Sequence, residues 1–125
     1  MSEAMQTLVD AWKDHQDWPV MATVDSEGRP NIIYVGEIAL DPEIGFIVAD
    51  NYFNKTRANI ESGSSGAILF ITKERKAYQV KGAIEYLTEG AVYAKMLENH
   101  DPKHPGLAAT VVKVEEVYSG AERLI

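Results

Sequence analysis

The chain contains no cysteine among its 125 residues. Disulfides, thiol catalysis, thiolate metal sites and cysteine-held iron–sulfur clusters are therefore excluded, and any redox chemistry must come from a bound cofactor. Long apolar runs are also missing, and residues 1–6 lack the basic segment followed by an apolar stretch that marks a secretion signal. We therefore expect a cytoplasmic protein with no membrane partner.

Positive charge is scarce. Twelve Lys and Arg residues against nineteen Asp and Glu residues give a net charge of −7, which repels nucleic acid at long range. We therefore expect no nucleic-acid partner, and a phosphate-bearing ligand would have to be held by local amides, hydroxyls and a lysine. The length predicts one domain, small enough that an extended sheet needs a partner to cover it.

Short apolar runs separated by turn residues predict a mainly β chain with peripheral helices. Turn chemistry between neighbouring runs favours an antiparallel barrel or sandwich. Gly82, inside a long expected strand, marks a bulge or a close ligand approach, and Thr88 is expected to cap the last helix. The expected strands are residues 20–24, 30–35, 37–40, 46–49, 67–72, 77–87 and 107–118, and the expected helices are residues 2–15, 55–61 and 89–100.

An anion site is predicted where the apolar run ending at residue 49 gives way to a polar loop and a helix. Asn54 can cap that helix, whose first amides point outward and favour an anion together with the helix dipole. Lys55 would add a positive charge, and Thr56 a hydroxyl donor. The alternative is an ordinary capped helix with a solvated lysine, because a short motif often occurs by chance.

Two neighbouring patterns are compatible with a ligand pocket. Tyr52 and Phe53 sit beside the predicted anion site, where they would either flank a planar ligand or pack under the loop. Gln79 and Lys81 share one face of an expected strand, and such a polar pair either faces water or lines a pocket. The residues alone leave both alternatives open.

Two charged clusters have ordinary interpretations beside functional ones. The turn carrying Lys73, Arg75 and Lys76 is typical of a solvated hairpin tip, and it could also meet a substrate phosphate at a pocket mouth. His100 and His104 stand four residues apart, but the proline between them breaks the helix that would align their rings, and no third ligand is nearby. We expect no metal site there, with His100 at a polar helix end complementing the dipole.

Three segments, in order and with their spacing, carry a family resemblance that extends over about residues 18–118. They read Trp18-Pro-Val-Met-Ala-Thr-Val-Asp-Ser-Glu-Gly-Arg-Pro30, Phe53-Asn-Lys-Thr-Arg-Ala-Asn59 and Tyr78-Gln-Val-Lys-Gly82. The chain resembles the pyridoxamine 5′-phosphate oxidase-like family of FMN-binding split β-barrels. The resemblance implies a single domain over residues 1–125, with an N-terminal helix (1–16), a six-stranded antiparallel Greek-key barrel (18–118) with two helical insertions, and a C-terminal tail (119–125).

The resemblance further implies a homodimer with FMN held in grooves at the subunit interface. Lys55 and Thr56 would hold the phosphate, and Gln79 would contact the cofactor from a neighbouring strand or from the other subunit. The remaining implied contacts come from Ile33, Tyr34 and Val35, which would line the flavin, and from Asp50 and Asn51, which would approach its polar edge.

Two departures from the family pattern are visible. Many relatives place Arg or Asn for the phosphate where this chain has Ile33, so that either Asn31, on the same strand face, substitutes or fewer groups hold the phosphate. Vitamin-oxidising relatives also carry an Arg-x-His pattern near the C-terminus, whereas this chain ends Glu122-Arg-Leu-Ile125 with no histidine after His104. The substrate motif of a true pyridoxamine phosphate oxidase is therefore absent.

The function that these features favour is a flavin-dependent oxidoreductase. It would pass electrons from a nicotinamide dinucleotide or a redox protein to a small acceptor, with the chemistry supplied by FMN. No side chain is assigned as a catalytic acid or base. The alternative is a non-catalytic FMN electron carrier, or a relative that binds haem or a deazaflavin.

Overall fold

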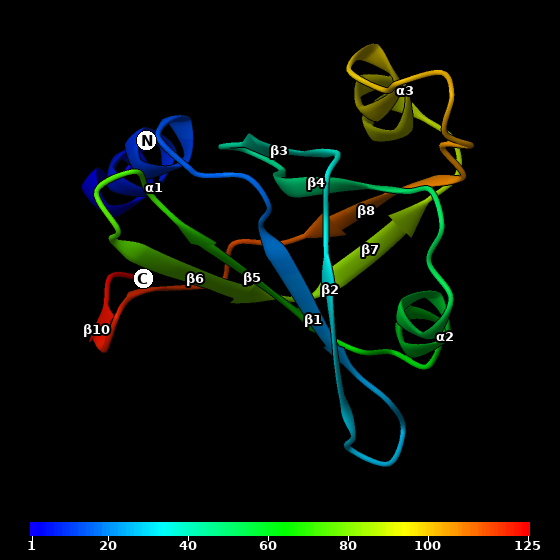
Figure 1. Ribbon diagram of the computed structural model, residues 1–125, viewed down its shortest axis with the longest axis horizontal. Helices are drawn as coiled ribbons and strands as arrows, with labels where there is room; N and C mark the ends of the chain where they lie inside the picture. The colour runs from blue at the N-terminus through cyan, green and yellow to red at the C-terminus, as the bar shows by residue number, and fades with distance from the viewer.

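A computed structural model describes all residues, 1–125, and contains three helices and ten strands (Figure 1). The helices are α1 (Glu3–Lys13), α2 (Lys55–Glu61) and α3 (Ala91–Glu98). The strands are β1 (Val20–Val24), β2 (Pro30–Tyr34), β3 (Ile38–Asp41), β4 (Gly45–Asp50), β5 (Gly66–Ile71), β6 (Ala77–Gly82), β7 (Ile84–Leu87), β8 (Ala108–Val112), β9 (Glu116–Ser119) and β10 (Glu122–Arg123).

The strands form two antiparallel sheets that together close a barrel. One sheet has the order β10-β9-β6-β5-β1-β2 and the other the order β3-β4-β8-β7. The chain runs from one sheet into the other at β2–β3, β6–β7 and β8–β9, and each of these successive pairs acts as one long bent strand. Together with β1, β4 and β5 they make the six strands of the barrel. The fold is therefore the mainly β, six-stranded antiparallel barrel expected from the sequence.

The two longest expected strands are broken at a corner of the barrel. Residues 77–87 divide into β6 and β7, and residues 107–118 into β8 and β9, which pair with them. Gly82 lies at this corner, where a Cβ atom would come within 1.8 Å of the Lys113 carbonyl oxygen. The group that approaches Gly82 is thus a backbone carbonyl of the same chain, and the prediction of two continuous strands is wrong.

Helix α1 closes one end of the barrel. The Ser2 hydroxyl accepts a hydrogen bond from the Met5 amide and so caps the helix start. Leu8 is fully buried, and the Trp12 ring packs edge-on against Phe46 and Phe70, with centroids 4.9 and 5.1 Å apart. This end of the molecule is filled by apolar side chains, and a ligand site must lie elsewhere.

Helix α2 has the expected bounds, whereas helix α3 differs from the expected helix. Helix α3 covers the outer face of β4 and β8, where Met96 joins Ile47 and Val111 in a second apolar cluster. It begins at Ala91 after Gly90, whose φ is +91°, so the prediction that Thr88 caps it is wrong. No helix is both long and apolar enough to cross a membrane.

Candidate functional site

A cavity of about 530 Å³ lies between β2, the end of β4, the start of α2 and the loop after α3. Pockets of this size are typical of small-molecule and cofactor sites. Of the nine residues predicted as cofactor contacts, seven line the cavity and two, Asp50 and Gln79, do not. The seven are Asn31, Ile33, Tyr34, Val35, Asn51, Lys55 and Thr56.

The predicted phosphate residues meet at one end of the cavity. The Asn31 side-chain amide donates to the Thr56 hydroxyl at 3.0 Å, so these residues, 25 positions apart, lie in contact. Lys55 is exposed and makes no ion pair within the chain. The Asn54 side chain makes no capping hydrogen bond, which corrects that prediction and leaves it unbonded to the first amides of α2. The corner therefore offers a free ammonium and the Thr56 hydroxyl hydrogen to an anion, because the Asn31 amide donates to Thr56 and to Thr23.

Aromatic and small residues form the wall on the β2 side. Tyr34 and Trp18 are 73% and 62% exposed, which is unusual for rings of this size unless a ligand or partner covers them. Trp18 lies against Gly36, where a Cβ atom would be only 3.3 Å from the indole ring. Glycine at this junction between β2 and β3 therefore allows the ring to lie close to the backbone beside the cavity.

Asp50 lies behind the cavity wall. Its carboxylate is fully buried and accepts two hydrogen bonds from Arg57, each 2.8 Å long, and one from the Phe53 amide at 3.0 Å. The Tyr86 hydroxyl also donates to it. Burial raises the pKa of Tyr86, and the hydrogen bond to Asp50 raises it further. Asp50 thus holds α2 and residues 51–54 against the barrel.

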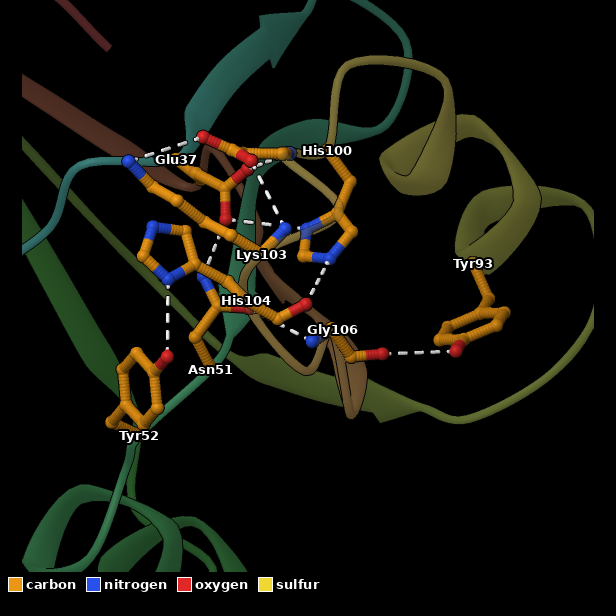
Figure 2. Close-up of polar contacts among 9 residues, drawn as sticks. Glu37, Asn51, Tyr52, Tyr93, His100, Lys103, His104 and Gly106 are labelled. Atoms are coloured by element: carbon orange, nitrogen blue, oxygen red, sulfur yellow. Dashed lines mark hydrogen bonds and ion pairs between the residues drawn. The ribbon is translucent and has the colours of Figure 1, made fainter.

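Asn51 lines the cavity, with its amide already engaged by protein groups. Its Oδ1 accepts from the Gly106 amide at 2.9 Å, and its Nδ2 donates to Glu37 Oε1. Glu37 Oε2 also accepts from the Asp101 amide at 2.8 Å. Figure 2 shows how the end of β4, the β2–β3 junction and the loop after α3 meet at these side chains.

The loop after α3 was not predicted to take part. His100, expected at a solvated helix end, has a side chain only 9% exposed, and its Nδ1 lies 3.2 Å from Glu37 Oε1. His104 lines the cavity, and its Nδ1 lies 3.1 Å from the Tyr52 hydroxyl. Tyr52 and Phe53 both line the cavity, and Phe53 also packs against the core. The lining residues that sequence reasoning missed are Trp18, Gly36, Glu37, Ala49, Asp101, Lys103 and His104.

Gln79 and the basic turn lie away from this cavity. Gln79 on β6 is separated from β2 by β5 and β1, which at ordinary strand spacing places it about 14 Å away. It faces outward in a cross-strand row with Leu69, Val20 and Tyr34. Within one chain, Gln79 therefore does not reach the cavity. The basic turn is the β5–β6 connection, next to the end of α1, and none of its three cationic residues lines the cavity.

The closed antiparallel barrel with a cavity beside β2 defines the chain as a split β-barrel protein. It belongs to the pyridoxamine 5′-phosphate oxidase family, since the family model of that description matches residues 4–119. An uncharacterized protein of Methanocaldococcus jannaschii is 35% identical over 105 residues, which cover 79% of this chain and 70% of that protein.

Solved structures with the same fold include an FMN-binding protein, a haem storage protein and a reductase. HupZ of Group A Streptococcus is 28% identical, with a TM-score of 0.75, 95% of this chain covered and 93% of that one. An FMN-binding protein from Syntrophomonas wolfei is 18% identical, with a TM-score of 0.77 and coverages of 96% and 88%. HutZ, the haem storage protein of Vibrio cholerae, is 17% identical, with a TM-score of 0.69 and coverages of 92% and 94%. An F420 reductase is 19% identical, with a TM-score of 0.62 and coverages of 81% and 88%.

Proposed function

We propose that the cavity binds FMN. The observation that carries this proposal is the contact between Asn31 and Thr56 beside the unpaired Lys55, which gathers phosphate-binding groups at one end of a cavity large enough for a cofactor. Ile33, Tyr34 and Val35 would line the flavin ring. Asn31 would stand in for the group missing at Ile33 by holding the Thr56 hydroxyl, which would then donate to the phosphate.

Replacing Lys55 with alanine is expected to weaken FMN binding by about 1.5–3 kcal/mol, the usual range for a hydrogen bond to a charged group. That loss corresponds to a roughly 10- to 150-fold higher Kd, measured by the quenching of flavin fluorescence on titration. Riboflavin, which lacks the phosphate, should bind both proteins alike. Lys113→Ala, which removes an ammonium outside the cavity, is the matched control. Equal FMN affinity of Lys55→Ala and wild type would show that the phosphate site is wrongly assigned.

We further propose that two copies associate through the outer face of β2, β1 and β5. Apolar side chains on this face remain uncovered: Ile32, Leu69 and Ile71 are 65%, 43% and 39% exposed. Contiguous exposed apolar residues on a sheet mark an interaction surface. Gln79 belongs to the same face, so in a dimer it would approach the partner's cofactor. The Asp50 carboxylate would act on the cofactor only through the elements that it holds.

As an activity, we propose electron transfer to a small acceptor by a flavin-dependent oxidoreductase. FMN would supply the redox chemistry when bound. The protein's part would be to fix the ring between Tyr34 and the barrel wall and to hold the phosphate at Lys55. Because the chain is net negative, a dinucleotide donor would receive little long-range attraction, and Lys103 at the cavity is the local cation best placed to meet it.

Stopped-flow bleaching of the bound flavin tests this activity. Reduction by NADH or NADPH should be slow but saturable, because the donor must be recruited by local contacts rather than by the overall field. Raising the ionic strength should change the rate little. Salt screens the long-range repulsion between the donor and the net-negative protein, and it also screens the local attraction to Lys103, so these two effects oppose each other. Bleaching by dithionite or a protein donor alone would contradict a nicotinamide-dependent enzyme and support an electron carrier.

A second candidate is a carrier or storage protein for a different ligand. It is favoured by the occurrence of the same fold in the haem storage protein HutZ and in an F420 reductase. Haem would present a carboxylate to the Lys55 corner where FMN would present a phosphate, so this corner fits either ligand. Mass spectrometry of the ligand released from protein purified from its native cells would decide between FMN, haem and a deazaflavin.

A further inference from the structure

We propose that Glu37 is a positioning residue that fixes the loop after α3, residues 99–107, as one wall of the ligand cavity. The proposal rests on the proposed function only in treating this cavity as the functional site. The identity of the ligand does not enter it, because the contacts lie within the protein. Glu37 also lines a second cavity, of about 410 Å³, between β3 and α3, and therefore stands where the two cavities meet.

Glu37 joins segments that lie far apart in the sequence. Oε2 accepts from the Asp101 amide at 2.8 Å, and Oε1 accepts from Asn51 Nδ2. The Asn51 amide in turn binds Gly106 N at 2.9 Å. One carboxylate thus ties the end of β4 to both ends of the loop (Figure 2). Its side chain is 20% exposed, so little water competes for these bonds.

The charge of the Glu37 carboxylate lies beside an imidazole. A bare carboxylate beside a cavity for an anionic ligand would repel it, but His100 faces this one at 3.2 Å. His100 Nε2 lies 2.7 Å from the His104 carbonyl oxygen, which only accepts, so Nε2 carries a proton. Nδ1 then faces Glu37 and has no hydrogen-bond partner. His100 is therefore the imidazole that lies against the Glu37 carboxylate.

Few other contacts hold the loop after α3 in place as a wall of the cavity. Asp101, Lys103 and His104 line the cavity. Outside the loop itself, residues 101–104 are bonded through the Asp101 amide to Glu37 and through His104 to the exposed Tyr52 hydroxyl. Gly106 and Leu107, where the loop joins β8, are held by other groups. Loss of Glu37 should therefore free the middle of the loop without unfolding the barrel.

Limited trypsin cleavage after Lys103 reports directly on this freedom, since Lys103 is in the middle of the loop and is not followed by proline. We expect Glu37→Gln to be cut there roughly tenfold faster than wild type, because the carboxylate's charge-assisted bonds are lost. Glu85→Gln, which breaks the exposed pair with Lys113, is the matched control and should be cut at the wild-type rate. The urea midpoint of global unfolding, measured in parallel, separates local opening from general destabilisation.

The pH dependence gives an independent readout. Burial raises the pKa of Glu37, but the Asp101 amide, the Asn51 amide and the two histidines lower it more, so the net pKa lies below its ordinary value of 4.5. The bonds that Glu37 makes to the loop should persist at pH 4.5 and above, and they should be lost as the pH falls through the lowered pKa of Glu37. The titratable groups that face Glu37 or belong to the loop beside it are His100, Asp101, Lys103, His104 and, across the cavity, Tyr52.

In NMR spectra of ligand-free protein, the Asn51 Nδ2 protons should shift with a midpoint below 4.5, because they donate to the titrating carboxylate. In Glu37→Gln this step should disappear. If Glu37→Gln does not fold, His100→Gln provides the second test and should also accelerate cleavage after Lys103. Unchanged cleavage in the folded variants, or an Asn51 side-chain titration that persists in Glu37→Gln, would overturn the proposal.

A binding measurement keeps this proposal distinct from the proposed function. FMN should protect Lys103 from trypsin in wild type and bind several-fold more weakly to Glu37→Gln. If FMN binds neither protein while Glu37→Gln is still cut faster, the ligand assignment fails and the role of Glu37 stands. If FMN binds both proteins equally and the cleavage rates agree, Glu37 does not position the wall.

Discussion

Replacement of Asp50 by alanine is expected to lower the free energy of unfolding by about 3–5 kcal/mol, the cost of removing one partner of a buried ion pair. The Asp50 side chain is fully buried, and that of Arg57 is 31% exposed. The substitution would leave the Arg57 guanidinium, the Tyr86 hydroxyl and the Phe53 amide without their acceptor. Urea unfolding followed by circular dichroism measures the loss.

The same pair also explains the charge state of Arg57. The hydrogen bonds to Asp50 and Tyr86 raise the pKa of Arg57 above its ordinary value. That ordinary value is already far above neutral pH, so the guanidinium stays charged when Asp50 is removed. In a double-mutant cycle, Asp50→Ala and Arg57→Ala should therefore be strongly non-additive, with the double variant more stable than the sum of the single losses predicts. Glu85→Ala, which breaks an exposed pair, should cost no more than about 1 kcal/mol. Additive losses would show that Asp50 and Arg57 contribute independently.

Asp50 illustrates what sequence alone could not establish about the site. The family resemblance placed it near the cofactor, but its partners come from α2 and β7, up to 36 residues away. The position of Lys55 and Thr56 at a helix start could be predicted from local residues, and a helix start favours anions. The contact of Thr56 with Asn31 depends on the pairing of β1 with β2 and could not be read from spacing.

The fold shows the same division between local and non-local information. Turn residues and period-two apolar patterns located almost every strand, since both signals are local. The corner at Gly82 requires knowledge that the Lys113 carbonyl approaches it from another strand. Similarly, His100 reads as a polar helix end until the loop after α3 folds against Glu37. The parts that could not be predicted are those in which distant segments meet.

The proposed dimer face leads to the last expected result: Leu69→Lys should convert the protein to a monomer at micromolar concentration. Leu69 is 43% exposed in the single chain and lies in the outward row with Val20 and Tyr34. In a two-fold interface the same patch is used by both copies, so that one substitution places two ammonium groups in it. At about 2 kcal/mol or more for each unpaired charge, dimerisation should weaken roughly 1000-fold or more.

Leu97→Lys is the matched control, because Leu97 is 40% exposed and lies on α3, away from this face. Light scattering should give a dimeric mass for wild type and Leu97→Lys and a monomeric mass for Leu69→Lys, with unchanged circular dichroism for all three. FMN affinity should fall with the dimer, since Gln79 of one copy would reach the cofactor of the other only across this face. A wild-type monomer with FMN bound would refute the interface, and a Leu69→Lys dimer would move it to another surface.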